Sequence, residues 1–112
     1  MISQETMMLF SRAACVLAVC TFFATPLAAQ SFNCRDAQKP DEVLICQNPQ
    51  LAALDERMAS MYFRLRNSLA GTARGKLEAD QTTWLQERYG CGRDAGCLRG
   101  LYERRIAELA KY

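Results

Sequence analysis

Apolar side chains in the second half of the chain recur at helical spacing. After Asn48-Pro49 they follow one another in steps of three and four, which places them on one face of a helix. The positions of this stripe are Leu51, Leu54, Met58, Met61, Tyr62, Leu65 and Leu69. Asn48 is a favoured N-cap and Pro49 suits the first helical position. The pattern predicts a long helix with one buried face, ending at Ala70-Gly71-Thr72.

Two later segments repeat this period. One runs from about Ala73 to Tyr89, with Thr72 as a candidate N-cap. Its stripe consists of Leu77, Gln81, Trp84 and Arg88. The other follows Asp94, a residue type that favours the N-cap position. Its stripe consists of Leu98, Leu101, Tyr102, Arg105, Ile106 and Leu109. Both segments are predicted helices that carry polar residues on largely apolar faces.

A shorter helix precedes these three. It is expected to run from Pro40 to near Cys46, because proline at the first position and acidic residues in the first turn favour a helix start. The chain shows no alternating run of β-branched residues and no internal repeat. We therefore predict an all-α fold: a small antiparallel helical bundle of one short and three longer helices, since short loops make neighbouring helices antiparallel.

The first residues have the order of a secretory signal peptide. A polar start that ends at Arg12 is followed by the apolar run Ala13–Ala24, and small residues precede Gln30. The run is shorter than the ~20 apolar residues of a membrane span. We expect residues 1–29 to be cleaved and residues 30–112 to form one periplasmic or secreted domain without an integral membrane span.

Two alternatives stay open for this N-terminal segment. The first is an uncleaved N-terminal anchor. The second is lipid attachment at Cys20 within the sequence Leu17–Cys20. Val19 disfavours the second alternative, because it is bulky where lipoprotein signals want a small residue, and much apolar sequence would follow Cys20.

Cysteine usage points to two disulfides. Cys15 and Cys20 lie in the predicted signal peptide, so four cysteines remain in the domain: Cys34, Cys46, Cys91 and Cys97. An even number of cysteines in a small exported chain predicts disulfides, and four allow three connectivities. The spacings favour the local pairs Cys34–Cys46 and Cys91–Cys97. Zinc is disfavoured, because neither spacing matches a zinc site and the chain contains 0 His.

The charge distribution argues against a nucleic-acid partner. The net charge of the chain is +2, and Glu5 and Arg12 cancel each other within the predicted signal peptide. Basic residues are interleaved with acidic ones instead of forming a basic cluster. The composition therefore does not favour nucleic-acid binding.

Four polar residues lie on or beside the apolar stripes: Asp55, Gln81, Arg88 and Arg105. A charge at the margin of a core is costly unless it is paired and hydrogen-bonded. We expect one structural polar network between helices, in which Asp55 pairs with Arg88 or Arg105. The alternative interpretation is a polar pocket or a contact with a partner protein.

Catalytic residues are poorly represented. The absence of histidine removes the commonest general base, and the cysteines are expected in disulfides. The candidate carboxylates are Glu56, Glu78, Asp80 and Glu87, which lie beside basic residues where solvated ion pairs are expected. The chain has no glycine-rich phosphate loop and no serine nucleophile elbow. We predict neither enzymatic activity nor a cofactor.

Several motifs resemble a known family. The first half has Asn33-Cys34, Ile45-Cys46 and Pro49, followed by Leu51, Leu54-Asp55, Met58 and Tyr62. The second half has Gln81, Trp84, Leu85, Arg88 and Cys91, and then Cys97, Leu98, Tyr102, Arg105, Ile106 and Leu109. With these motifs, the region from about Phe32 to Leu109 resembles the LprI-type lysozyme-inhibitor family of small exported bacterial proteins.

This resemblance implies an all-helical domain crosslinked by disulfides and a lysozyme or related peptidoglycan hydrolase as a protein partner. It assigns no inhibitory residues and no oligomeric state. The second hypothesis is an envelope structural or stress-interaction protein without a hydrolase target. The net charge of +2 favours this second hypothesis, because lysozymes are commonly basic and charge would not steer such an encounter.

Overall fold

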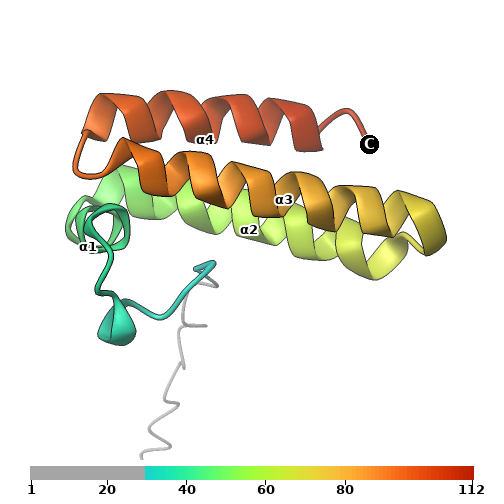
Figure 1. Cartoon of the computed structure of the whole chain (residues 1–112), viewed down its shortest axis with the longest axis horizontal. Helices are drawn as coiled ribbons and strands as arrows, with labels where there is room; N and C mark the ends of the chain where they lie inside the picture. The colour runs from blue at the N-terminus through green and yellow to red at the C-terminus, as the bar shows by residue number, and fades with distance from the viewer. Residues whose placement is uncertain (1–29) are drawn as a thin grey trace, which may run out of the picture.

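The computed structural model describes residues 30–112, and these residues form helices without strands (Figure 1). The elements are the 3-10 turn η1 (Cys34–Asp36) and the helices α1 (Pro40–Gln47), α2 (Pro49–Ser68), α3 (Gly71–Cys91) and α4 (Ala95–Leu109). The predicted fold class, one short and three longer helices, is confirmed. The predicted signal peptide of residues 1–29 lies outside the described residues.

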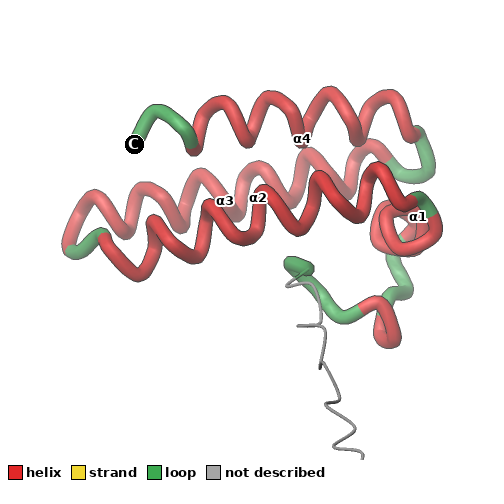
Figure 2. Tube along the Cα trace, turned by 180° about the vertical axis from the view of Figure 1, so that it is seen from behind, coloured by secondary structure: helices red, strands yellow, loops and turns green. Residues whose placement is uncertain are grey.

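The three longer helices lie side by side. α3 returns along α2, and α4 returns along α3, so that α2 and α4 point the same way (Figures 1 and 2). α1 is an exception to the antiparallel arrangement, because it crosses the start of α2 and is seen nearly end-on in both views. α1 thereby closes one end of the bundle. None of the described helices is long and apolar enough to cross a membrane.

Side-chain caps set two of the helix starts. The Asn48 Oδ1 accepts hydrogen bonds from the backbone N–H groups of Gln50 at 3.0 Å and Leu51 at 3.2 Å. The Asp94 Oδ1 accepts one from the Cys97 N–H at 3.0 Å. Both predicted caps are confirmed, and each satisfies N–H groups that the first helical turn leaves unpaired.

The predicted cap of the third helix is wrong. α3 begins at Gly71, its N-cap is Ala70, and this cap makes no side-chain hydrogen bond. Thr72 is therefore already inside the helix. The physical reason lies in the turn itself: Gly71 has a φ of 61°, a conformation that glycine adopts without a steric penalty. The chain reverses direction at Gly71 without needing a polar side chain.

Both predicted disulfides are confirmed. Cys34 and Cys46 are joined with their Cα atoms 5.8 Å apart, which links η1 to α1. Cys91 and Cys97 are joined with their Cα atoms 5.6 Å apart, which closes the turn between α3 and α4. Each bond crosslinks a short loop and lowers the entropy of the unfolded chain. α1 and the turn between α3 and α4, which carry one bond each, lie at the same end of the bundle (Figure 1).

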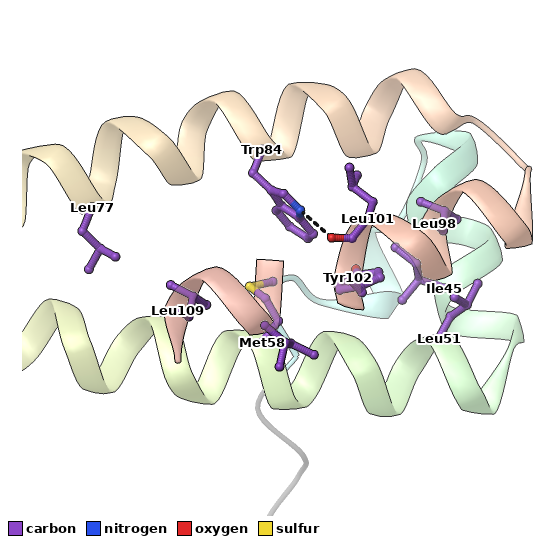
Figure 3. Packing of buried hydrophobic residues seen from close by; sticks show 10 residues of the cluster. Ile45, Leu51, Met58, Leu77, Trp84, Leu98, Leu101, Tyr102 and Leu109 are labelled. Carbon is purple, nitrogen blue, oxygen red and sulfur yellow. Dashed lines mark hydrogen bonds between the residues drawn. The ribbon is translucent and has the colours of Figure 1, made fainter. Parts of the chain in front are cut away.

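The core lies between α2, α3 and α4, and Ile45 of α1 extends it at one end (Figure 3). The buried apolar residues are Ile45, Leu51, Met58, Leu77, Trp84, Leu98, Leu101, Tyr102, Ile106 and Leu109. Trp84 donates its indole N–H to the Leu101 carbonyl at 3.2 Å, and its ring meets the Tyr102 ring edge to face at 5.1 Å. The only tryptophan of the chain is therefore both packed and hydrogen-bonded. It holds α3 and α4 in register beside the buried polar residues.

Candidate functional site

A buried polar cluster lies where α1 crosses the bundle. Its centre is Arg88 of α3, whose side chain is 5% exposed. The Arg88 Nε donates a hydrogen bond to the Asp41 Oδ2 at 2.9 Å, and its Nη1 donates one to the Ser31 hydroxyl at 3.2 Å. The same Nη1 lies 3.7 Å from the Asp55 Oδ1. We call Ser31, Asp41, Asp55, Arg88 and Tyr102 the Arg88 cluster.

Asp55 is the main acceptor of this cluster. Its side chain is fully buried and accepts hydrogen bonds from the Ser31 backbone N–H at 2.8 Å and the Ser31 hydroxyl at 2.7 Å. The Tyr102 hydroxyl donates a third hydrogen bond to the Asp55 Oδ1 at 2.7 Å. Asp55 therefore connects the N-terminal segment to α2 and α4. A buried carboxylate needs such partners, because an unpaired buried charge is costly.

The electrostatics of the cluster favour a protonated Tyr102. Burial raises the pKa of the Tyr102 hydroxyl well above its ordinary value, and the neighbouring Asp55 carboxylate raises it further. The hydroxyl therefore stays a donor to Asp55 across the physiological pH range.

Arg88 gains additional contacts from aromatic rings, since its guanidinium carbon lies 5.0 Å from the centre of the Phe32 ring and 5.9 Å from that of the Trp84 ring.

A second cluster surrounds Arg105 of α4. The Arg105 Nε donates a hydrogen bond to the Gln81 Oε1 at 3.0 Å, and its Nη1 lies 3.3 Å from the Glu108 Oε2. The Gln81 amide in turn donates to the sulfur of Met58 at 3.3 Å. Arg105 is thus held by α3 and by its own helix.

The structure places the four polar residues predicted from sequence in two clusters instead of one network. It brings Asp55 together with Arg88, and Gln81 together with Arg105. The reason is helical register. Tyr102 precedes Arg105 by nearly one turn of α4 and takes the position facing Asp55, so Arg105 points into the neighbouring layer beside Gln81.

Three members of the Arg88 cluster were missed by sequence reasoning: Ser31, Asp41 and the hydroxyl of Tyr102. Asp41 is the strongest omission, because it is fully buried and makes the shortest contact with Arg88. The available signal was the demand of Arg88 for a carboxylate partner. Asp41 and Glu42 are the acids of the predicted short helix that ends near Cys46, and the predicted disulfide joins Cys46 to Cys34.

The described part of the chain offers little for catalysis. The carboxylates considered as a catalytic pair from sequence are largely engaged at the surface: Glu78 with Arg74 at 3.0 Å, and Asp80 with Lys76 at 2.6 Å. Glu87 likewise contacts Arg104. Residues 30–112 contain no group of three or more His, Cys, Asp or Glu side chains placed to hold a metal ion. The two clusters are suited to fixing helix register rather than to chemistry.

The outer surface offers one groove with a distinct charge. It lies between α2 and the C-terminal end of α4 and has a volume of about 670 Å³. We call it the Arg57 groove. Its lining consists of Arg57, Ser60, Met61, Arg64, Leu65, Ser68, Leu109, Ala110 and Tyr112. Unlike the two buried clusters, this groove is open to a partner.

Fold and clusters define a small all-α domain that is crosslinked by two disulfides and held in register by buried arginines. The family model described as Lysozyme inhibitor LprI matches residues 34–109, which include all four helices and both disulfides. The chain belongs to the LprI lysozyme-inhibitor family. No solved structure matches it.

Curated relatives carry the same family name. Lipoprotein LprI of Mycobacterium tuberculosis is 32% identical over 89 residues, and so is Lipoprotein LprI of Mycobacterium bovis. Each alignment covers 77% of this chain and 44% of the relative. The chain therefore spans less than half the length of these relatives. The lipoprotein relatives and the two disulfides support an exported protein.

Proposed function

We propose that this chain is a periplasmic or secreted protein that inhibits a lysozyme, without enzymatic activity of its own. The observation that carries this proposal is the family match, which extends over residues 34–109 and so includes nearly the whole described domain. A match of this extent covers the core, the disulfides and all members of the polar clusters except Ser31, rather than one shared motif.

The structure supports this role by its rigidity. Two disulfides and two buried polar clusters constrain the helices, so little conformational entropy remains to be lost when a partner binds. One face of such a domain can present the ~800 Å² that each partner contributes to a specific interface. A preorganised surface is what a small exported inhibitor needs.

The second candidate is an envelope structural or stress-interaction protein. The net charge of +2 favours it, because a basic chain gains no long-range attraction toward a basic lysozyme. Under this alternative the same fold would bind a different envelope component. The two candidates differ in whether a lysozyme is slowed.

The experiment is lysis of a peptidoglycan suspension by lysozyme in the presence of the oxidised domain, residues 30–112. We expect the lysis rate to fall with added domain and to level off at a fixed molar ratio. The control is the same protein after reduction and alkylation of its cysteines, which should inhibit less. An unchanged lysis rate at a large molar excess, for several lysozyme types, would contradict the proposal and favour the envelope-interaction candidate.

A further inference from the structure

The Arg57 groove combines an apolar floor with a cationic rim. Met61, Leu65 and Leu109 supply the apolar side chains, and Arg57 and Arg64 stand beside them with exposed side chains. Ser60 and Ser68 add hydroxyl groups on the same side of α2. The groove therefore offers packing, hydrogen bonding and positive charge to one partner.

Arg57 and Arg64 differ from most other arginines of the longer helices in having no ion pair. Within residues 30–112, Arg66 and Arg74 contact Glu78, and Arg104 contacts Glu87 and Glu108. No carboxylate of this region lies within ion-pair distance of Arg57 or Arg64. Two guanidinium groups on one surface thus keep their full capacity for an external carboxylate.

The spacing of these two arginines places them on the same face of α2. They are seven residues apart, which is about two turns and ~10.5 Å along the helix axis. Their side chains are long enough to converge on one acidic site. Guanidinium groups bind carboxylates in a planar, bidentate geometry, and arginine is enriched among the residues that dominate binding energy at interfaces.

A lysozyme has such an acidic site. Glycoside hydrolases place two carboxyl side chains on either side of the scissile bond, about 5–5.5 Å apart in retaining enzymes. These carboxyl groups lie at the base of an open cleft, so a projecting arginine of the inhibitor can reach them. The match is one of local charge, and it does not depend on the net charge of either protein.

We propose that the Arg57 groove is the surface that docks on a lysozyme, with Arg57 and Arg64 directed at the acidic catalytic cleft. This inference rests on the proposed function and specifies its contact surface. The apolar floor packs against the lip of the cleft, while the two arginines take the place of the positive charge that develops on the substrate. Binding is therefore competitive with an oligosaccharide in the cleft.

Local complementarity also answers the objection from net charge. Charges further apart than the Debye length of about 8 Å are largely screened at physiological ionic strength. The repulsion between two basic proteins is therefore weak, whereas a contact between guanidinium and carboxylate groups in a desolvated cleft is retained. The proposal thus needs no long-range attraction.

An apolar surface is the competing candidate within the described domain. Phe63, Leu85 and Tyr89 are large apolar residues with exposed fractions of 43%, 37% and 57%. This surface lacks a feature that selects one partner, because aromatic side chains pack against many surfaces. The Arg57 groove instead has a positive charge that matches the carboxylates of a lysozyme cleft.

The test compares two double variants with equal charge. Arg57→Glu/Arg64→Glu alters the groove, and Arg35→Glu/Arg93→Glu alters two exposed arginines outside it. Dissociation constants are measured by calorimetry against an active c-type lysozyme, with and without the N-acetylglucosamine trimer. We expect the groove variant to bind at least about 30-fold more weakly than the parent, the size of a hot-spot loss, and the control variant to bind within about 3-fold.

The trimer should weaken binding of the parent, and circular dichroism should show that both variants are folded, since exposed substitutions rarely cost more than ~0.5 kcal/mol. Unchanged affinity of the groove variant would overturn the docking surface while leaving inhibition intact. A third variant, Phe63→Ala/Tyr89→Ala, alters the aromatic surface, and loss of binding in this variant alone would also overturn the docking surface. Failure of the parent itself to bind any lysozyme would instead reject the proposed function.

Discussion

Replacing Asp55 with alanine removes the main acceptor of the Arg88 cluster. The Ser31 N–H, the Ser31 hydroxyl and the Tyr102 hydroxyl lose their hydrogen bonds, and Arg88 loses the most distant of its three nearby carboxylates. Asp41 still pairs with Arg88 at 2.9 Å and Glu42 at 3.5 Å, so the guanidinium keeps two carboxylate partners. Each buried donor left without an acceptor costs about 1–3 kcal/mol, and Ser31 can partly regain water.

We therefore expect Asp55→Ala to lower the free energy of unfolding by about 3–5 kcal/mol, because three donors lose their acceptor at once and only those of Ser31 partly regain water. With an m value of about 2–3 kcal/mol/M in guanidinium chloride, the unfolding midpoint falls by about 1–2.5 M. The assay is equilibrium unfolding of the oxidised domain, followed by the fluorescence of Trp84. This residue is the only tryptophan and packs against Tyr102, so its emission reports on the cluster.

Asp80→Ala is the matched control. Asp80 also pairs with a basic residue, Lys76, at 2.6 Å, but both side chains are exposed. Its removal should cost under about 1 kcal/mol, because solvent screens exposed pairs. Ser31→Ala, with an expected loss of about 1 kcal/mol, remains measurable if Asp55→Ala does not fold. A loss for Asp55→Ala as small as that for Asp80→Ala would refute the inferred role of the cluster.

Three further predictions follow from the fold and the cluster. Replacing Cys34 and Cys46 together with serine should lower the free energy of unfolding by about 2–3 kcal/mol, as measured by denaturant unfolding. Asn48→Ala should lower it by about 1 kcal/mol through loss of the α2 cap, whereas Thr72→Ala should change it little, because Thr72 is not a cap. Burial and the Asp55 carboxylate raise the pKa of Tyr102 above its unfolded value of 10.0, so the native state keeps this proton at a higher pH than the unfolded state does. Stability should therefore fall as the pH rises above about 10, and unfolding measured between about pH 9 and 11 should show a shallower fall for Tyr102→Phe.

Local signals allow most of the fold to be predicted. Asn48 and Pro49 specify the start of α2 through the cap and the fixed proline φ, and both act within a few residues of the chain. The start of α3 was predicted less well. Its N-terminus depends on a glycine with positive φ at Gly71 rather than on Thr72, and either residue type can begin a helix.

The polar cluster could be predicted only in part, because its contacts join distant segments. Periodicity finds Asp55 and Arg88, since a charge on an apolar stripe stands out. Asp41 does not stand out, because an acid in the first turn of a helix is favourable even in water. Its burial depends on α1 crossing the bundle next to Arg88, which lies 47 residues further along the chain.

The groove could not be predicted from sequence for a related reason. Arginines occur throughout α2, α3 and α4, and the sequence does not reveal which of them have ion-pair partners. The difference between Arg57 and Arg66 is set by the packing of α3 beside α2, which brings Glu78 within 3.5 Å of Arg66. Free and paired arginines become distinguishable only in three dimensions.

Inhibition of lysozyme itself is tested most directly with a soluble substrate. A protein that coats peptidoglycan also slows lysis of a suspension, whereas a chitooligosaccharide in solution reports on the enzyme alone. Hydrolysis of such an oligosaccharide by a fixed amount of c-type lysozyme is measured while the oxidised domain, residues 30–112, is added. We expect the rate to fall and to level off at one domain per lysozyme, and a rate that stays constant through a large molar excess would contradict inhibition.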